Sequence, residues 1–164
     1  MKDRSPAWRF LPLMLFLGLM LVLIQGLNTN PKDLPSALLN QPFPHSDITL
    51  PQHIHLINVW GSWCPACQQE HPLLMTLSKD WSIVGLNYKD EPHKAQQWLQ
   101  QWGNPYQSLI ADPNGQLGLD LGVYGAPETY LMDHQRTIRL RHAGILTQKV
   151  WETRFLPAIA ELTP

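Results

Sequence analysis

The stretch NVWGSWCPACQQEHP, residues 58–72, decides the fold, and it contains both cysteines of the chain, Cys64 and Cys67. The apolar, β-branched residues 53–60 predict a buried strand, and residues 65–81 predict a helix. A thiol between a strand and a helix faces the free N–H groups and the positive end of the helix dipole, which lower its pKa below the usual value of about 8.5. A second thiol one turn later lies on the same helix face and can resolve a mixed disulfide.

Two other uses of the cysteine pair are weaker. Structural zinc needs four ligands, whereas one CxxC motif supplies two, and no second cysteine pair exists in the chain. His71 lies on the same predicted helix, but no further histidine follows it at zinc-site spacing. An inert disulfide across one helical turn closes so short a loop that it adds little stability in the chain-entropy model. We therefore predict a working thiol couple and no metal site.

Strands and helices alternate through the rest of the chain. Early strand–helix–strand units favour parallel strands, and the last two strands, separated by three residues, favour an antiparallel hairpin. The sequence therefore predicts an α/β fold with a central mixed sheet and helices on both faces. The expected further elements are strands near residues 48–50 and over 82–88, 106–112, 128–133 and 137–144, and helices over 91–102 and 147–162, the last with Thr147 as N-cap.

An uncharged apolar run occupies residues 10–27, close to the minimum length of a transmembrane helix. A cleaved signal peptide is the alternative, but this run is longer than the usual apolar region and no A-x-A-like cleavage site follows it. Three basic residues precede the run and one closely follows it, so the positive-inside rule places the N-terminus in the cytoplasm. The expected division is a cytoplasmic segment over residues 1–9, a single-pass anchor over 10–27, a linker and lead-in over 28–52, and a globular domain over 53–164.

The charge balance argues against a nucleic-acid-binding protein. The chain is 44% hydrophobic and 15% charged, with a formal net charge of -1, and it has no basic excess. If the cell is bacterial, the globular domain lies in the periplasm, an oxidising compartment in which thiol pairs form disulfides.

Five motifs lie along the chain from about Asp33 to its end: LLNQPFP, LINVWGSWCPACQQEHP, VGLNYKD, DPNGQLGLDLGVYGAPETYLMD and RHAGILT. Together with the N-terminal anchor, they resemble the CcmG/DsbE family, the membrane-anchored cytochrome c biogenesis thioredoxins of the inner membrane. The resemblance implies a thioredoxin-like domain over residues 53–164. It also implies thiol–disulfide exchange, with Cys64 as the attacking thiol and Cys67 as the resolving thiol.

The resemblance extends to a substrate-binding surface. Pro127, in the GAPET motif, matches a cis-proline that faces the cysteines in this superfamily, and it would expose the Ala126 backbone to a bound peptide that pairs like an added strand. Trp63 either shields the site or presents a flat surface to a partner, and Pro65 sets the first turn of the helix. Tyr124 lies near the proposed groove.

Acidic residues are the third feature that the resemblance assigns. Asn58 stands where ordinary thioredoxins carry a buried aspartate, and the resemblance suggests that Glu70 and Glu128 supply acidic character instead. Glu70 is three residues beyond Cys67 and shares its helix face. A nearby carboxylate raises a thiol pKa or takes its proton through water. The alternative for each is a solvated surface charge, and which carboxylate acts on which thiol stays open.

The expected substrate is a disulfide in apocytochrome c or in a haem-lyase component, as the resemblance implies. It also implies a membrane electron donor of the DsbD/CcdA type and no prosthetic group. The direction of exchange does not follow from the motif, because an oxidising protein uses the same residues. Two alternatives therefore remain: a general periplasmic oxidant or isomerase of the same fold, and a tethered module that only binds unfolded cytochrome.

Overall fold

The computed structural model describes residues 10–28, 38–45 and 47–163, and the chain divides into two compact units, Met1–Leu34 and Pro35–Pro164. In the first unit, helix α1 covers Leu11–Asn28. No helix of the described residues combines the length and the hydropathy that are needed to cross a membrane. The predicted transmembrane anchor therefore stays a prediction. The predicted cytoplasmic segment and residues 29–37 of the predicted linker lie outside the described residues.

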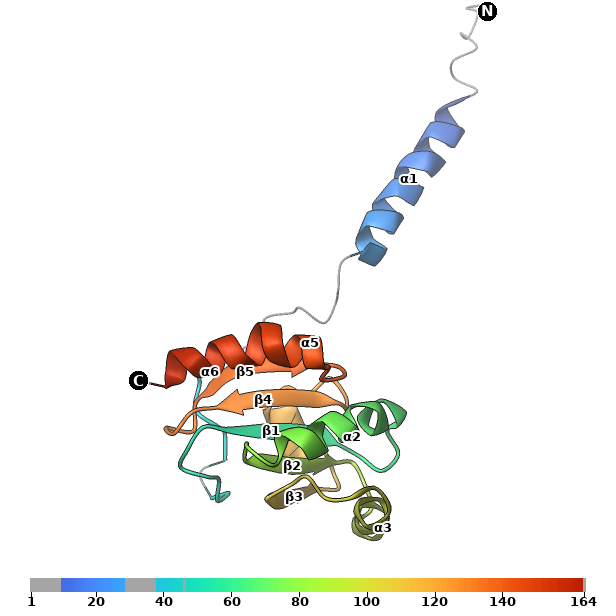
Figure 1. Ribbon diagram of the computed structural model, residues 1–164. Helices are drawn as coiled ribbons and strands as arrows, with labels where there is room; N and C mark the ends of the chain where they lie inside the picture. The colour runs from blue at the N-terminus through green and yellow to red at the C-terminus, as the bar shows by residue number, and fades with distance from the viewer. Residues whose placement is uncertain (1–9, 29–37, 46, 164) are drawn as a thin grey trace, which may run out of the picture. The chain divides into compact units, whose positions relative to one another are not determined.

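The second unit is built on one mixed five-stranded sheet in the order β3-β2-β1-β4-β5 (Figure 1). Strands β1, β2 and β3 are parallel, whereas β4 is antiparallel to β1, and β5 is antiparallel to β4. This arrangement confirms the predicted mixed sheet and its C-terminal hairpin. The strands are β1 (His55–Trp60), β2 (Ile83–Tyr88), β3 (Ser108–Asp112), β4 (Glu128–Met132) and β5 (Ile138–Ala143).

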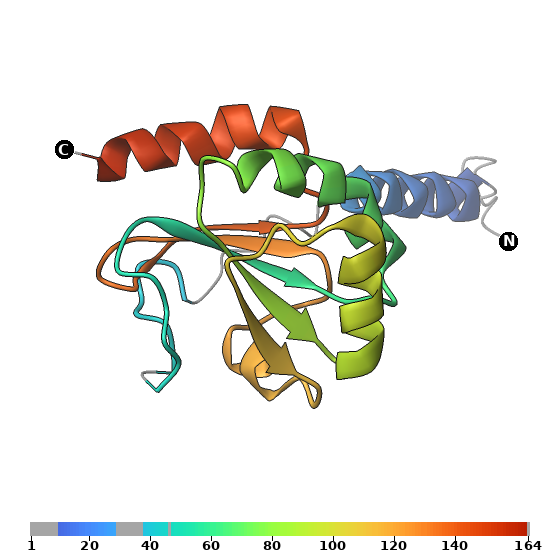
Figure 2. The same ribbon diagram turned by 60° about the horizontal axis from the view of Figure 1, so that its bottom comes forward.

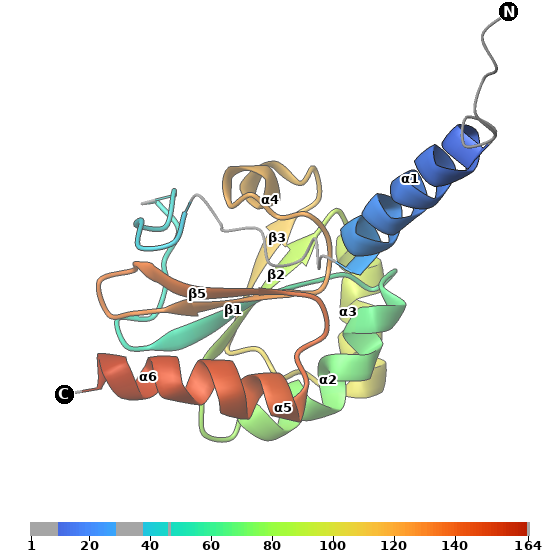
Figure 3. The ribbon, with the colours of Figure 1, turned by 90° about the horizontal axis from the view of Figure 1, so that it is seen from above.

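Helices cover both faces of the sheet. Right-handed crossovers from β1 to β2 and from β2 to β3 run in the same direction, so their helices α2 and α3 lie on one face together with the C-terminal helix (Figure 2). The short helix α4 lies on the opposite face with the lead-in segment (Figure 3). The helices are α2 (Pro65–Leu77), α3 (Pro92–Trp102), α4 (Gln116–Asp120), α5 (Gln148–Val150) and α6 (Leu156–Leu162).

Two apolar cores, one on each face, hold these layers together. Because both faces of the sheet are covered, every residue of β1, β2 and β4 is buried, which explains why the first two strands read as continuous apolar runs. The core on the α2 face contains Leu56, Leu74 and Phe155, and the core on the α4 face contains Val59, Leu117 and Ile138. The disulfide-forming cysteines belong to the first core.

The strand predicted near residues 48–50 is wrong. Residues 40–43 lie against β5 instead, with an isolated bridge between Pro42 and Thr137, and the Phe43 N–H donates to Arg136 O. The alternating Ile48 and Leu50 pack into the core on the α4 face without strand pairing. Their apolar alternation reflects this packing. The start of β5 is already bonded to residues 40–43.

The predicted C-terminal helix is confirmed, and it contains an irregularity that its sequence does not indicate. Thr147 caps it as predicted, since its hydroxyl oxygen accepts from the Val150 N–H. Between α5 and α6, residues Trp151–Phe155 form a π-helical turn in which the Leu156 N–H donates to Trp151 O, five residues back. Pro157 follows, and because it has no N–H and crowds the preceding turn, it favours this local widening.

Candidate functional site

The cysteine pair lies at the junction of β1 and α2. Cys64 is the N-cap of α2, and it forms a disulfide with Cys67, with 5.3 Å between their Cα atoms. Pro65 follows as the first residue of the helix, where its missing N–H leaves no bond unmade. Both cysteines are buried, with exposed fractions of 3% and 2%. The predicted placement of the attacking thiol at a helix N-terminus is therefore confirmed.

The helix N-terminus supplies a hydrogen bond to the Cys64 sulfur. The Cys67 backbone N–H donates to Cys64 Sγ over 3.1 Å. Once the disulfide is reduced, the same N–H and the positive end of the α2 dipole favour a thiolate at Cys64. Cys67 has no comparable position, because it lies one turn inside the helix. This asymmetry supports the assignment of Cys64 as the attacking thiol and Cys67 as the resolving thiol.

The loop before β4 carries the predicted proline. The Ala126–Pro127 peptide bond is cis, as the resemblance implied. Pro127 is buried and Ala126 is partly buried. The pairing of a bound peptide with the Ala126 backbone stays a prediction.

Two large aromatic side chains of the predicted binding surface are exposed. Trp63 has an exposed fraction of 51%, and its indole Nε1 donates to Tyr88 O over 3.2 Å. Tyr124 has an exposed fraction of 63%, and the Arg141 guanidinium lies 4.3 Å from the centre of its ring. Because one contact holds each ring in place, both present ordered apolar surface to solvent. Pro65 is exposed as well.

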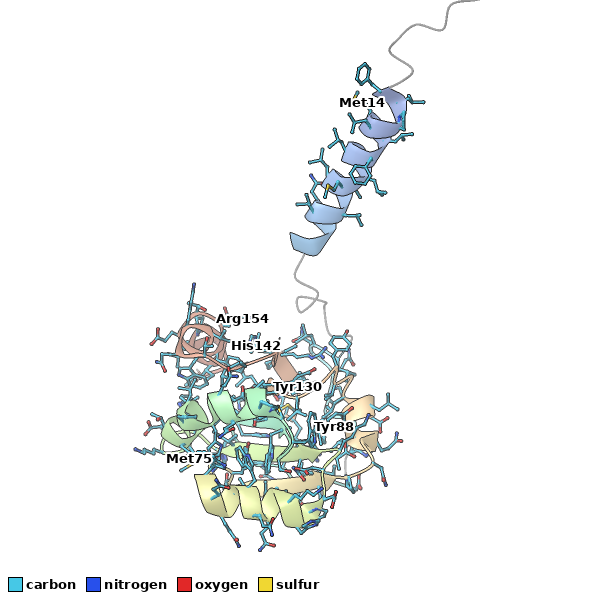
Figure 4. All side chains as sticks on the ribbon, turned by 90° about the vertical axis from the view of Figure 1, so that its right-hand side faces the viewer. Met14, Met75, Tyr88, Tyr130, His142 and Arg154 are labelled. Carbon is cyan, nitrogen blue, oxygen red and sulfur yellow. A yellow bond between two sulfur atoms is a disulfide. The ribbon has the colours of Figure 1, made fainter. Side chains whose placement is uncertain are left out.

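Glu128 occupies a different environment from the one predicted for a tuning acid. Its Oε1 accepts from the N–H groups of Tyr124 and Gly125, at 2.7 and 3.3 Å. Its Oε2 accepts from the hydroxyl of buried Tyr130, labelled in Figure 4, at 2.9 Å. Arg141 donates to both oxygens at 3.0 and 2.9 Å and forms a buried ion pair. Glu128 therefore holds the loop that precedes the cis-proline in place, and this role is better supported than proton transfer.

Glu70 is buried on α2, three residues after Cys67, in a hydrogen-bond network that includes Asn58. The Asn58 Nδ2 donates to Glu70 Oε1 at 2.7 Å and to Thr129 Oγ1 at 3.2 Å. The Leu146 N–H donates to Glu70 Oε2 at 2.6 Å. On the other side of the amide, the Tyr106 hydroxyl donates to Asn58 Oδ1 at 2.9 Å, and the amide nitrogen faces Glu70.

Burial decides the protonation of this carboxyl group. It raises the pKa of Glu70 to about 7, although the hydrogen bonds from Leu146 and Asn58 pull the pKa in the opposite direction. Glu70 thus exchanges a proton in the neutral range, which suits an acid–base group one turn from the resolving thiol. The alternative of a solvated surface charge does not apply to either glutamate, since both are 1% exposed.

This raised pKa predicts that the free energy of unfolding falls as pH rises, whereas an ordinary carboxylate with a lowered pKa gives the opposite trend. The folded protein binds the Glu70 proton more tightly than the unfolded chain, so the stabilising contribution is complete below pH 4.5 and is lost as pH rises through 7. Relative to Glu70→Gln, the free energy of unfolding of the oxidised protein should fall by about 2–3 kcal/mol between pH 5 and pH 8. Urea unfolding at several pH values measures this slope, and parallel curves for the two proteins would contradict it.

Three residues of the site were not identified from the sequence. Tyr106 and Arg141 reach Asn58 and Glu128 only through tertiary contacts, and the sequence carries no local signal for either pairing. Asp90 lies in the VGLNYKD motif, but no role was assigned to it. Its carboxylate accepts a hydrogen bond from the Ser62 N–H, two residues before the attacking cysteine.

Comparisons with known proteins identify relatives that are thiol:disulfide interchange proteins. The Redoxin family model matches residues 32–154. The chain is 44% identical to the thiol:disulfide interchange protein DsbE of Pseudomonas aeruginosa, over 93% of this chain and 92% of the relative. It is 42% identical to the thiol:disulfide interchange protein DsbE of Escherichia coli K12, over 90% of each.

Solved structures share the fold. A candidate thiol:disulfide interchange protein DsbE from Chlorobium tepidum superposes with a TM-score of 0.57 and 25% identity, over 66% of this chain and 81% of the other. A thiol-disulfide isomerase from Corynebacterium glutamicum superposes with a TM-score of 0.59 over 83% of this chain and 99% of the other. At 15% identity, the second comparison supports the fold alone.

Proposed function

Since this chain belongs to the Redoxin family and is a thiol:disulfide oxidoreductase of the DsbE type, we propose that it reduces disulfides in apocytochrome c, or in a haem-lyase component, during c-type cytochrome maturation. Haem attaches to cytochrome c through the thiols of a CxxCH motif, so these cysteines must be reduced first. The sequence resemblance to cytochrome c biogenesis thioredoxins supports this substrate.

The exchange proceeds in two steps. The Cys64 thiolate attacks one sulfur of the substrate disulfide, a mixed disulfide forms, and the other substrate sulfur leaves as a thiolate that takes up a proton. Cys67 then loses its proton and attacks Cys64 Sγ, which releases the second substrate thiol. The protein is left with the Cys64–Cys67 disulfide, and two electrons have passed to the substrate. Glu70 is the group placed to accept the Cys67 proton, because it lies one helical turn away and titrates near neutral pH.

The observation that supports the direction is the buried acid one helical turn from Cys67. A carboxylate near a thiol disfavours the thiolate, and therefore destabilises the reduced form relative to the disulfide. A couple of this kind gives up electrons readily, whereas strong oxidants are proteins whose reduced form is stabilised. Because burial raises the pKa of Glu70 to about 7, the effect operates in the molecules whose Glu70 is ionised, and it grows as pH rises through 7.

The proposal includes a location and an electron supply. The uncharged run over residues 10–27 and the basic residues before it support a single-pass anchor in the inner membrane, with the catalytic domain in the periplasm. In that oxidising compartment a reductant must be recharged, so we propose a membrane electron donor of the DsbD/CcdA type. Carbonate extraction of membranes from cells that express the full chain tests the anchor, and release into the soluble fraction would contradict it.

The reduction potential of the Cys64–Cys67 couple tests the direction. We expect a value near or below about -200 mV, together with reduction of an oxidised CxxCH peptide by the reduced protein. Equilibration with glutathione or dithiothreitol buffers measures the potential, and thiol quantification measures the peptide. A value near -120 mV would instead indicate a general periplasmic oxidant, and the cytochrome proposal would have to be withdrawn.

A further inference from the structure

Asp90, in the loop between β2 and α3, binds the turn that leads to the attacking cysteine. Its Oδ2 accepts from the Ser62 N–H at 2.6 Å, and its Oδ1 accepts from the Ser62 hydroxyl at 2.8 Å. Both bonds join segments 28 residues apart in the chain. The carboxylate also accepts from Asn87 Nδ2 and from the Glu91 N–H, each at 2.8 Å. Four hydrogen bonds therefore fix this side chain between the two loops.

A second contact joins the same two loops. The Trp63 indole donates to the carbonyl of Tyr88, a residue labelled in Figure 4. Gly61 leaves the room for this contact, because a Cβ at that position would come within 2.5 Å of the indole nitrogen. Lys89 has a φ of 48°, a left-handed conformation that is uncommon for a residue with a side chain. Such a backbone persists where its surroundings hold it, as they do here between Tyr88 and Asp90.

Asp90 is an anion at neutral pH. Burial opposes its ionisation, but the hydrogen bonds from Ser62, Asn87 and Glu91 outweigh burial, and the pKa of Asp90 is lowered. The other charged groups close to it in the chain are Lys89, directly before it, and those at the start of α3, where Glu91 pairs with Lys94 and with His93 at the surface. Because those groups are exposed, solvent screens them more strongly than it screens Asp90, which is 7% exposed.

We propose that Asp90 is a positioning residue for thiol–disulfide exchange, which holds the Ser62–Cys64 turn in place and, through its charge, disfavours the Cys64 thiolate. The geometry of the turn makes both effects possible, since the carboxylate bonds to the backbone two residues before Cys64. The inference rests on Cys64 as the attacking thiol, and it does not require cytochrome as the substrate.

The charge of Asp90 opposes the helix dipole at the same thiol. The α2 N-terminus and the Cys67 N–H favour the thiolate, whereas a fixed anion next to the turn disfavours it. Asp90 therefore shifts the couple towards the disulfide and makes the reduced protein a stronger reductant. Glu70 contributes an effect of the same sign from within α2, next to Cys67. The two acids act on different cysteines, Asp90 from the loop before α3 and Glu70 from within α2.

Asp90→Asn in the full chain tests this role, with Glu91→Gln as the matched control that removes a neighbouring charge without touching the turn. We expect the pH midpoint for alkylation of Cys64 in the reduced protein, followed by peptide mass spectrometry, to fall by roughly half a unit in Asp90→Asn. The reduction potential should become less negative, and Glu91→Gln should match the wild type in both. An unchanged midpoint in Asp90→Asn, or an equal shift in the control, would overturn the inference.

A second variant keeps the test decisive if Asp90→Asn does not fold. The double substitution Ser62→Ala and Asp90→Ala removes the carboxylate together with the hydroxyl that it binds, and the expected shift has the same direction. A wild-type protein whose cysteines show no reversible redox couple would reject the exchange activity itself. A normal couple with no response to either variant would reject only the role of Asp90.

Discussion

Cys64→Ser is expected to lower the rate of disulfide reduction by at least about a thousandfold, to the level of free thiols in solution. The serine hydroxyl still fits the N-cap position, so the fold is preserved, but it does not ionise at neutral pH and cannot form a disulfide. The measurement is the initial rate at which the reduced protein reduces an oxidised CxxCH peptide. A variant that retains a tenth of the activity would contradict the assignment of the attacking thiol.

Cys67→Ser is the matched control, because it removes the resolving thiol and leaves the attacking one. This variant should still attack the peptide but remain joined to it, so a mixed disulfide through Cys64 accumulates and is seen by non-reducing electrophoresis. Accumulation in Cys64→Ser instead would reverse the two roles. The double variant Cys64→Ser/Cys67→Ser addresses the alternative of a tethered binding module, since that alternative predicts that cytochrome maturation survives it.

Arg141→Met is expected to lower the free energy of unfolding by about 3 kcal/mol, because it leaves the Glu128 carboxylate buried without its cation. Glu128 retains three other donors in the variant, from Tyr124, Gly125 and Tyr130, which places the effect at the lower end of the range for broken buried ion pairs. Arg141 also donates to Gly122 O, so the loop before the cis-proline loses a tether as well. Urea unfolding of the oxidised protein at pH 7 measures the change.

The double variant Glu128→Gln/Arg141→Met separates the charge effect from the loss of packing. With no charge left in the interior, it should be more stable than Arg141→Met alone. A double variant whose destabilisation equals the sum of the two single substitutions would show that the two side chains do not act as a pair. In that case Arg141 would stabilise the loop through its contacts with Gly122 and Tyr124 alone.

The sheet and the cysteine site were predictable because their signals are local. Each signal is contained within a few residues of the chain. These signals are the apolar runs of β1 and β2, the proline at the start of α3 and the Thr147 cap. The cis-proline followed from the resemblance, and the structure confirms it. Helix α4 was not predicted, because it is only five residues long and its N-cap, Gly115, makes no side-chain cap hydrogen bond. The Asp112 carboxylate accepts instead from the N–H groups of Leu117 and Gly118, five and six residues further along the chain.

The polar partners of the site were less predictable, because they depend on the folded arrangement. Tyr106 and Asn58 are 48 residues apart, and nothing near either residue indicates their hydrogen bond. Glu70 and Glu128 look alike in sequence, since each is an acidic residue within a motif of the family resemblance. The structure shows that their hydrogen-bond partners differ. Glu128 accepts from the guanidinium of Arg141, whereas Glu70 accepts from the neutral donors of Asn58 and Leu146. Their different roles therefore follow from the residues that fold against them.

The segment at residues 40–43 also limits which parts of the sheet edges are open to pairing with another chain. Its bonds to Ile138 and Arg136 cover the start of β5, so within the described residues β3 and the rest of β5 form the sheet edges without a neighbouring strand. An uncovered edge strand is a template for intermolecular β-pairing and aggregation. At β3, the length of five residues limits how many hydrogen bonds a second chain would gain.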